Sequence, residues 1–311
     1  MIVTVTPNPS IDRTVTVERL HIGEINRALS SRVDPGGKGV NVSRALCANG
    51  ADTLAILPLG GPDGRLLAAL LDQAGVRHRE VALAGTTRTN VAIVDPRGIT
   101  TKVNEPGPTM STDELDALRT SILSSTRETD WLALCGSLPP GAPPTWFADI
   151  ITAHPGRIAV DASGVGFTQA VAAGPDLIKP NLEELEELVG RELTTFGDVL
   201  EAANSVVQVG VTMVVVSLGS DGALAVTAEG NWFATAAVTA PLSTVGAGDC
   251  LLAGLLHALQ SGADPQKAIA SAVAWGSAAV SLPGSKVPNP SDIDSITVST
   301  DPPPLNTQLS R

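Results

Sequence analysis

Tyrosine is absent from this 311-residue sequence, and cysteine, other aromatic residues and positive charge are all scarce. The three cysteines, Cys47, Cys135 and Cys250, lie far apart and form no Cys-x-x-Cys pair. So small and odd a set argues against a disulfide framework or a structural zinc site. We expect a protein of a reducing cytoplasm in which each cysteine is a small buried residue.

Basic runs and long apolar runs are also missing. The formal net charge of −12 argues against binding to nucleic acid or to an anionic membrane. No apolar stretch approaches the roughly 18 residues of a membrane span, and residues 1–9 are typical of a first strand rather than of a signal peptide. A protein of this charge that handles phosphates must use a few placed cations and backbone N–H groups.

Strand and helix patterns alternate along most of the chain. Apolar strands are expected at 2–6, 53–59, 131–134, 158–161, 177–178 and 213–217. Helices are expected at 40–48, 65–74, 144–153, 167–173, 182–189, 198–209, 248–260 and 265–281, and Ser111 to Glu114 form a capping box that opens another. This order predicts a three-layer α/β/α domain with a mostly parallel central sheet.

Two segments differ from this alternation. Residues 13–33 and 87–104 are extended and polar on one side, with a turn at 95–98, and they predict a small β lid beside the main body. We therefore expect one domain over 1–298. Residues 299–311 have nothing to bury and are expected to form a loose, disordered tail.

The most informative motif is Thr244-Val-Gly-Ala-Gly-Asp249, which runs directly into an apolar helix. Glycines at a helix start leave backbone N–H groups pointing outward at the positive end of the helix dipole, which suits a transferring phosphoryl group. Asp249 is placed to accept a proton from an attacking hydroxyl. The alternative is an ordinary loop with an aspartate that complements the helix dipole. Neither a Walker A loop nor a Gly-x-Gly-x-x-Gly dinucleotide motif is present.

Three further motifs carry polar groups at strand ends. Gly36-Gly-Lys-Gly-Val-Asn41 combines glycines that allow close backbone approach with one cation. Lys179-Pro-Asn-Leu-Glu-Glu184 places Asn181 and Glu184 on one helical face, either as oxygen ligands for Mg²⁺ or as part of a solvated acidic surface. Ser217-Leu-Gly-Ser-Asp-Gly222 suits a nucleotide against backbone, or simply a tight turn.

Together, Gly36-Gly-Lys-Gly-x-Asn-x-x-Arg-Ala45 and Gly246-Ala-Gly-Asp249 resemble the two signatures of the ribokinase-like sugar kinases, the phosphofructokinase B family. The resemblance extends from residue 1 to about residue 290. It implies a ribokinase-like α/β body with a β lid, often shared across a homodimer, and the use of ATP and Mg²⁺. It also implies small-molecule partners, a sugar phosphate and ATP, without nucleic acid or membrane.

The resemblance also implies roles for individual positions. Asp249 matches the position of the family's catalytic base, and Gly246, Ala247 and Gly248 match its anion hole. Asn181 and Glu184 match the motif that organises Mg²⁺. The positions implied for ATP are Lys179, Asn181, Ser217, Gly219, Gly222 and Gly248. The candidate substrate-binding residues, which include the lid cations, are Asp12, Arg27, Gly37, Lys38, Asn41, Arg88, Lys102 and Ser137.

The opening Thr6-Pro-Asn-Pro-Ser-Ile-Asp12 and Gly136-Ser-Leu-Pro-Pro-Gly141 are most similar to the branch of 1-phosphofructokinases, tagatose-6-phosphate kinases and minor 6-phosphofructokinases. The two arms of fructofuranose are nearly symmetric about the ring, so small contact changes select between the 1-phosphate and the 6-phosphate. Lys38 favours fructose 1-phosphate. The alternatives are the other two activities of this branch, a nucleoside kinase, and a non-catalytic sugar-phosphate sensor, which would be expected to have lost Asp249 or the glycines.

Overall fold

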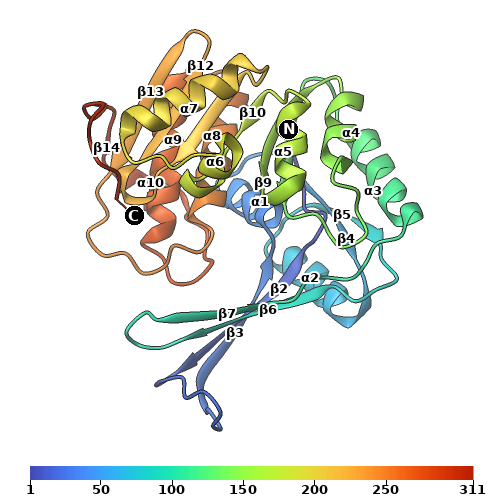
Figure 1. The fold of residues 1–311 in the computed structure, drawn as a ribbon. Coiled ribbons are helices and arrows are strands. Elements are labelled where there is room, and N and C mark those ends of the chain that lie inside the picture. Colours follow the sequence, from blue (N-terminus) through green and yellow to red (C-terminus); the bar gives the residue numbers. More distant parts are fainter. Residues whose placement is uncertain (311) are drawn as a thin grey trace.

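The computed structural model describes residues 1–310 of the 311-residue chain. In this part of the chain a ten-stranded sheet forms the body, in the order β14-β13-β12-β11-β10-β9-β8-β1-β4-β5 (Figure 1). Its strands are β1 (Ile2–Val5), β4 (Thr53–Leu59), β5 (His78–Ala82), β8 (Trp131–Gly136), β9 (Arg157–Ala162), β10 (Leu177–Ile178), β11 (Met213–Ser217), β12 (Ala223–Thr227), β13 (Gly230–Ala236) and β14 (Val298–Ser299). The neighbours from β5 to β11 pair in parallel, and those from β11 to β14 are antiparallel.

Helices cover both faces of this sheet. One face carries α3 (Thr112–Ser125), α4 (Trp146–Ala153), α5 (Gly164–Ala172), α6 (Leu182–Val189) and α7 (Phe196–Gln208), whose buried side chains share one apolar cluster. The other face carries α1 (Lys38–Ala48), α8 (Ala247–Gln260) and α9 (Pro265–Val280), with a second cluster. Helix α2 (Gly61–Gln73) packs beside α1 and β4, and the short α10 (Pro290–Asp294) packs on α9. The predicted three-layer architecture is confirmed.

The strand sequences explain the two-sided burial. Val214, Val215 and Val216 of β11 are fully buried, and successive side chains of a strand point to opposite faces, so both layers of helices contact them. The predicted capping box also forms, because Ser111 accepts from the Glu114 N–H while the Glu114 carboxylate accepts from the Ser111 N–H. None of the helices within residues 1–310 is long and apolar enough to cross a membrane.

A separate four-stranded sheet projects from the body as an arm, below it in Figure 1. We call this sheet the lid. It consists of β2 (Ser10–Val17), β3 (Ala28–Gly36), β6 (Arg88–Val94) and β7 (Thr100–Asn104), in the order β3-β2-β6-β7. The two segments expected to form it do so, and β2 and β3 extend further toward the body than expected. Asp12 therefore lies on a lid strand at the base of the arm.

The antiparallel edge of the main sheet was not predicted. Residues 223–236 form the β12–β13 hairpin, directly after the glycine-rich loop that had been interpreted as a nucleotide loop or a tight turn. Strand β5, at the opposite edge, was also missed. Its His78-Arg-Glu sequence is polar and largely exposed, so it lacks the apolar run by which the central strands were recognised.

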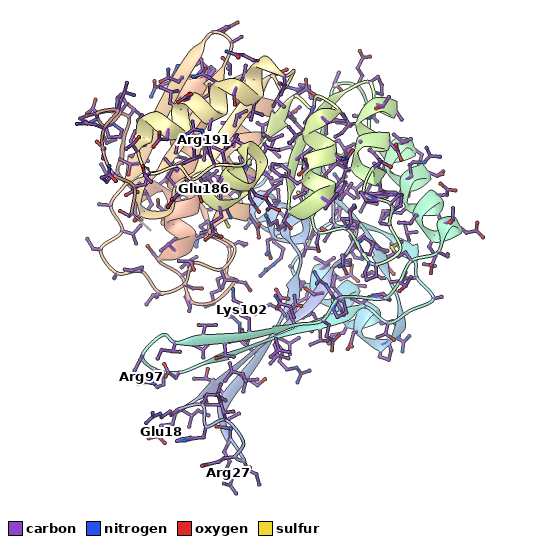
Figure 2. The ribbon with its side chains drawn as sticks, in the orientation of Figure 1. Glu18, Arg27, Arg97, Lys102, Glu186 and Arg191 are labelled. Carbon is purple, nitrogen blue, oxygen red and sulfur yellow. The ribbon has the colours of Figure 1, made fainter. Side chains whose placement is uncertain are left out.

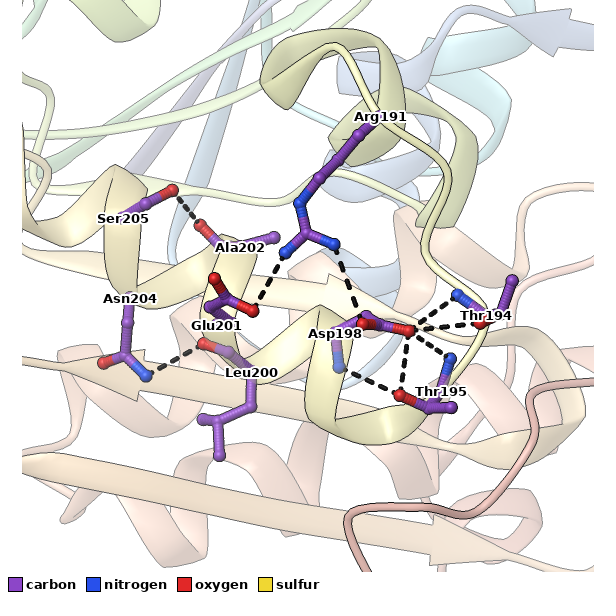
Figure 3. A network of polar contacts seen from close by, with 9 residues as sticks. All are labelled: Arg191, Thr194, Thr195, Asp198, Leu200, Glu201, Ala202, Asn204 and Ser205. Carbon is purple, nitrogen blue, oxygen red and sulfur yellow. Dashed lines mark hydrogen bonds and ion pairs between the residues drawn. The ribbon is translucent and has the colours of Figure 1, made fainter.

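The expectation of a loose tail over 299–311 is corrected for the residues described. Ser299 pairs with Thr235, and the carbonyls of Leu305 and Thr307 accept hydrogen bonds of 2.8 and 3.0 Å from the first amides of α7. Figure 3 shows this end of α7, where Thr195 and Asp198 form the capping box and Arg191 pairs with Asp198. Most of these contacts are made by the backbone of the tail, which satisfies amides at the helix start, and the side-chain pattern of the sequence does not indicate them.

Candidate active site

The candidate residues gather where the parallel strands end. In an open α/β sheet this edge is the place where loops and helix starts meet to bind ligands. Asp161 is at the end of β9, Lys179 follows β10, and Ser217 ends β11. The last two loops lie side by side, since the Ser217 N–H donates a 3.0 Å hydrogen bond to the Pro180 carbonyl.

The start of α8 forms a cup of backbone amides at residues 246–249. Gly246 adopts φ 79°, a left-handed conformation that favours glycine, and so turns the chain into the helix. Of the first N–H groups of α8, that of Ala247 donates a 3.3 Å hydrogen bond to the Thr244 carbonyl, which leaves those of its neighbours Gly246 and Gly248 for a ligand. A Cβ added to Gly248 would lie 3.6 Å from the Lys179 ammonium, so a cation stands beside the cup. This arrangement suits an anion.

Asp249 lies at the edge of the cup and is 8% exposed. Its Oδ2 atom accepts a 2.9 Å hydrogen bond from Asn41 Nδ2, although the two residues are 208 positions apart. Burial, followed by the negative charge of Asp161, raises the pKa of Asp249 to about 6. A carboxylate with a pKa close to neutrality is suited to accept a proton and release it again.

Asp161 lies in this cluster although it was not among the residues expected from the sequence. It is fully buried, and its carboxylate contacts two ammonium groups, Lys38 Nζ at 2.7 Å and Lys179 Nζ at 3.3 Å. Burial alone would raise the pKa of Asp161, but the two lysines outweigh it and hold the pKa below its usual value. The signal was an aspartate near the end of an otherwise apolar predicted strand, where a buried charge needs a partner.

The glycine-rich start of α1 brings Lys38 and Asn41 into the site. Gly37 caps the helix at φ 115°, and a Cβ there would collide with the Thr6 side chain. Lys38 Nζ also lies 3.6 Å from Glu184 Oε1, and despite its burial the two carboxylates raise the pKa of Lys38 well above its ordinary value. The ammonium thus faces the Asp161 cluster in this structure.

The base of the lid holds a second polar group around Asp12. Its Oδ1 atom accepts hydrogen bonds from Ser10 Oγ at 2.7 Å and Asn90 Nδ2 at 3.1 Å. Burial raises the pKa of Asp12, and those two hydrogen bonds and the Arg88 charge oppose the shift. The Gly36 backbone lies against the carboxylate, and any side chain at that position would occupy its place. Asn90 is a further residue whose contact the sequence did not predict.

Arg88 stands next to this group on β6. Its Nη1 and Nη2 atoms donate to the carbonyls of Glu105 and Asn8, both at 2.9 Å, so the guanidinium is held by backbone on both sides. The buried Nε atom makes no hydrogen bond within residues 1–310. A fixed, half-buried guanidinium with a remaining donor suits a phosphate group.

Asn181 and Glu184 form a capping box at the start of α6. The Asn181 side-chain oxygen accepts from the Glu184 N–H at 2.7 Å, and Glu184 Oε2 accepts from the Asn181 N–H at 2.9 Å. The amide oxygen of Asn181 is therefore engaged in the cap. Glu184 Oε1 faces Lys38 instead and is the oxygen of this pair that is directed into the site.

The predicted nucleotide loop at 217–222 has a structural reason for its second glycine. Gly222 adopts φ 107°, and a Cβ there would collide with the Ala234 carbonyl of β13. Gly219, at φ 59°, would meet no atom within 4 Å. The loop is thus pressed against the antiparallel edge on one side and open on the other.

Three candidates contribute less to this cluster. Ser137 is half-buried in the loop after β8. Arg27 is exposed near the distal end of the lid, and Figure 2 shows it far from the body. Lys102, on β7, is also exposed and lies on the side of the lid nearer the body in Figure 2. Within a single chain the structure does not bring Arg27 to the other residues.

Comparison with known proteins agrees with this geometry. The model of the pfkB family of carbohydrate kinases matches residues 6–292. A 1-phosphofructokinase of Rhodobacter capsulatus is 38% identical, covering 97% of this chain and 98% of its own. An ATP-dependent 6-phosphofructokinase isozyme 2 of Mycobacterium tuberculosis is 35% identical over 94% of this chain and 88% of its own. The solved structure of phosphofructokinase-2 from Escherichia coli superposes with a TM-score of 0.90 at 34% identity, covering 94% of this chain and 97% of its own.

Proposed function

Because the chain belongs to the pfkB family of carbohydrate kinases, we propose that it transfers the γ-phosphoryl group of ATP to the free primary hydroxyl of fructose 1-phosphate. The product is fructose 1,6-bisphosphate. The observation that carries this proposal is the buried Asp249 carboxylate, with a pKa raised to about 6, at the edge of the amide cup of α8.

Asp249 accepts the proton of the sugar hydroxyl as its oxygen attacks the γ-phosphorus in line. The bond from the γ-phosphorus to the bridging oxygen of ATP breaks, and ADP leaves with that oxygen. Negative charge spreads over the equatorial oxygens during the transfer, and in our proposal the N–H groups of Gly246 and Gly248 face it, while that of Ala247 is engaged with the Thr244 carbonyl. Because these dipoles are fixed before the reaction, they need no reorganisation.

Lys38 and Lys179 place two positive charges beside the cup. Asp161 holds both ammonium groups at 2.7 and 3.3 Å, so they do not sample the many rotamers of a free lysine. We assign both to the phosphates of ATP, with Asn181, Ser217 and Gly219 lining the nucleotide from the neighbouring strand ends. In this assignment Lys38 contacts the phosphates of ATP rather than the phosphate of the sugar.

Mg²⁺ fits this set of oxygens as a companion of the nucleotide. Within residues 1–310 no group of three acidic, histidine or cysteine side chains forms a dedicated metal cage. Magnesium commonly keeps several waters and binds through one or two carboxylates plus substrate phosphates. Glu184, through Oε1, is the residue placed to hold such a hydrated ion, which when bound neutralises charge on the β- and γ-phosphates.

The sugar phosphate binds at the base of the lid. Asp12, held by Ser10 and Asn90, accepts hydrogen bonds from sugar hydroxyls, while Arg88 grips the phosphate already on the sugar. Lys102, Ser137, Gly37 and Asn41 border the same space in our proposal. Movement of the lid toward the body would exclude water from the transferring phosphoryl group.

The choice of fructose 1-phosphate rests on the relatives, among which 1-phosphofructokinases recur at 32–38% identity. The 6-phosphofructokinase isozyme at 35% identity supports fructose 6-phosphate as the second candidate, and tagatose 6-phosphate is the third. A sensor without catalysis is disfavoured, because both the glycine cup and a base with a raised pKa are retained.

A coupled assay of ADP release separates these functions. Purified protein is given ATP with Mg²⁺ and, in turn, fructose 1-phosphate, fructose 6-phosphate, tagatose 6-phosphate and free fructose. We expect the highest kcat/KM with fructose 1-phosphate. A preference for one of the 6-phosphates would reassign the substrate within the family, and binding of a sugar phosphate without ADP release would support the sensor.

We further propose a cytoplasmic homodimer that associates through the lid. The three cysteines are free thiols, as suits a reducing compartment. Three large apolar side chains are exposed on β3 and on the loop that joins it to β2, Ile22 at 95%, Ile25 at 86% and Leu29 at 66%, and a second lid would cover them. Light scattering of the intact protein tests this, since substitution of Ile22 and Ile25 by Asp should yield monomers.

A further inference from the structure

The amide of Asn41 stands between a carboxylate and a guanidinium. Its Nδ2 atom donates to Asp249 Oδ2 at 2.9 Å, and its Oδ1 atom accepts from Arg44 Nη1 at 3.0 Å. A half-turn of the amide would direct its oxygen at the carboxylate and its NH₂ group at the guanidinium. Both contacts would become repulsive, so Arg44 selects one of the two orientations.

Arg44 is itself held in place. The same Nη1 atom donates a 3.2 Å hydrogen bond to the Ser285 carbonyl, in the turn that follows α9. Its side chain lies one helical turn after Asn41 on α1, which brings the two residues to the same face of the helix. Burial lowers the pKa of Arg44, yet a guanidinium remains protonated at any pH of interest. A permanent donor thus faces the amide oxygen.

We propose that Arg44 is a positioning residue of this kinase, which fixes the Asn41 amide in the orientation that donates to Asp249 and so keeps the base ionised and aimed. The inference rests on the proposed role of Asp249. It concerns a residue that touches neither the carboxylate nor the transferring group, and that acts only through Asn41.

Other charged groups also face Asp249 and influence its ionisation, and the effect of Arg44 adds to theirs. Asp161 on β9 opposes its ionisation, while Lys38 on α1 and Lys179 after β10 favour it. Cys135 on β8 and Cys250 on α8 lie nearby as neutral thiols, because burial raises the pKa of each. Without Arg44 the amide can turn its oxygen toward a protonated Asp249, which stabilises the neutral form.

The test compares Arg44→Met, Arg44→Lys, Asn41→Ala and the double variant Arg44→Met/Asn41→Ala. The matched control is Arg157→Met, because Arg157 Nη2 also donates to one side-chain amide oxygen, that of Gln260, and to one carbonyl, that of Thr129. Arg157 opens β9, at the opposite end of this strand from Asp161. Its loss removes the same kind of contacts without touching Asn41.

Two readings are taken on each protein. The first is the acidic limb of the pH profile of kcat/KM, and the second is the titration of the Asp249 carboxyl by ¹³C NMR of labelled aspartate, assigned with Asp249→Asn. Arg44→Met should move both midpoints upward by about one pH unit, corresponding to a tenfold change in the ionisation constant. Arg44→Lys, which keeps a cation but lacks the planar fork, should shift them by less.

Non-additivity is the decisive outcome. Because Arg44 acts through Asn41, the double variant should titrate like Asn41→Ala alone, and Arg157→Met should titrate like the wild type. Additive shifts, or an unchanged midpoint in Arg44→Met and Arg44→Lys, would overturn the inference. The NMR arm reads Asp249 without turnover. If the wild type released no ADP with any sugar phosphate, the proposed function would fail, while the action of Arg44 through Asn41 could still be judged from the NMR titration.

Discussion

The ammonium group of Lys38 lies 2.7 Å from the carboxylate of Asp161, which joins the first turn of α1 to the end of β9. Asp161 is fully buried, so the ion pair is shielded from water on the carboxylate side. Such a pair contributes little net stability on average, since desolvation offsets the attraction. Its consequence here is geometric, because it fixes Lys38, the cation that we assign to the phosphates of ATP, before any ligand arrives.

Two neighbouring carboxylates of this site differ in their charge balance. Asp161 contacts two lysines, which hold its pKa below its usual value. The pKa of Asp249 is raised to about 6 by burial and by the charge of Asp161. Pairs of acidic groups whose surroundings push their pKa values apart commonly divide the roles of base and fixed charge. The predictions for the two residues therefore have opposite signs.

Replacement of Asp249, the base in our proposal, should strongly reduce turnover and leave binding intact. We expect Asp249→Asn to reduce kcat by at least about a hundredfold, within the range that general base catalysis contributes, because an amide cannot accept the hydroxyl proton. Calorimetric binding of the sugar phosphate should stay within a few-fold of the wild type. A near-normal kcat would remove Asp249 from the role of base.

The same substitution should stabilise the fold at neutral and alkaline pH. The pKa of Asp249 is about 6 in the folded protein and near its ordinary 3.8 in the unfolded chain. Its ionisation therefore disfavours folding, and stability is lost as the pH rises from about 4 through about 6. Asp249→Asn should unfold with a free energy higher by about 2–3 kcal/mol at pH 8, the equivalent of a shift of about two units.

Urea denaturation at pH 4 and pH 8 measures this difference. The gain should be largest at pH 8 and small at pH 4, where the wild-type residue is protonated in the folded state. An equal gain at both values would assign the effect to packing rather than to charge. Loss of stability at pH 8 would contradict the raised pKa.

Asp161→Asn should act in the opposite direction on stability. It leaves two buried or half-buried ammonium groups without their shared partner, and removal of one member of a buried pair costs about 3–5 kcal/mol in comparable cases. The stabilisation that the wild-type residue provides is present above its unfolded pKa and is lost as pH falls. The variant should therefore differ from the wild type most at neutral pH.

The matched control for this variant is Glu184→Gln, since Glu184 lies 3.6 Å from Lys38 but contacts only one of the two lysines. We expect it to lose less stability in the same urea titrations. Asp161→Asn should also move the acidic limb of kcat/KM to lower pH, because the charge that raises the pKa of Asp249 has been removed. A limb that moves upward would show that the lysines had left the site.

The sequence was sufficient for the architecture and for much of the site. Alternating apolar strands and amphipathic helices predicted the layers, because burial on both faces requires apolar runs such as Val214 to Val216. The motif around Gly246 predicted the amide cup, because the requirement for glycine there depends only on the local backbone conformation. The lid segments could be recognised because their alternation of polar and apolar residues ends at turns that can be identified in the sequence.

Contacts between distant segments were beyond the reach of that reasoning. Asp161 stood in an apolar strand with no partner nearby in sequence, and its two lysines come from residues 123 positions before it and 18 after it. The Asn41 amide is likewise defined by Arg44 on one side and by Asp249, 208 positions away, on the other. Only the topology of the sheet places these groups together.

Deletion of the C-terminal residues 304–311 should loosen the start of α7. The deletion removes the carbonyls of Leu305 and Thr307, which accept from Gly197 and Phe196, and the Leu309 N–H, which donates to the Thr194 carbonyl at 3.0 Å. The freed amides are solvated at the helix start, so the expected loss is moderate, about 1–3 kcal/mol in the free energy of unfolding. Urea titration measures it.

The tail also contacts the loop that we assign to the nucleotide. The backbone N–H and hydroxyl of Ser310 donate to the Asp221 carboxylate at 2.6 and 2.8 Å. The deletion should therefore raise the KM for ATP by a few-fold while the KM for the sugar phosphate changes little. Ser310→Ala is the control, since it keeps the backbone contacts and loses only the hydroxyl. If the deletion changed both KM values equally, the tail would act on the whole fold rather than on the 217–222 loop.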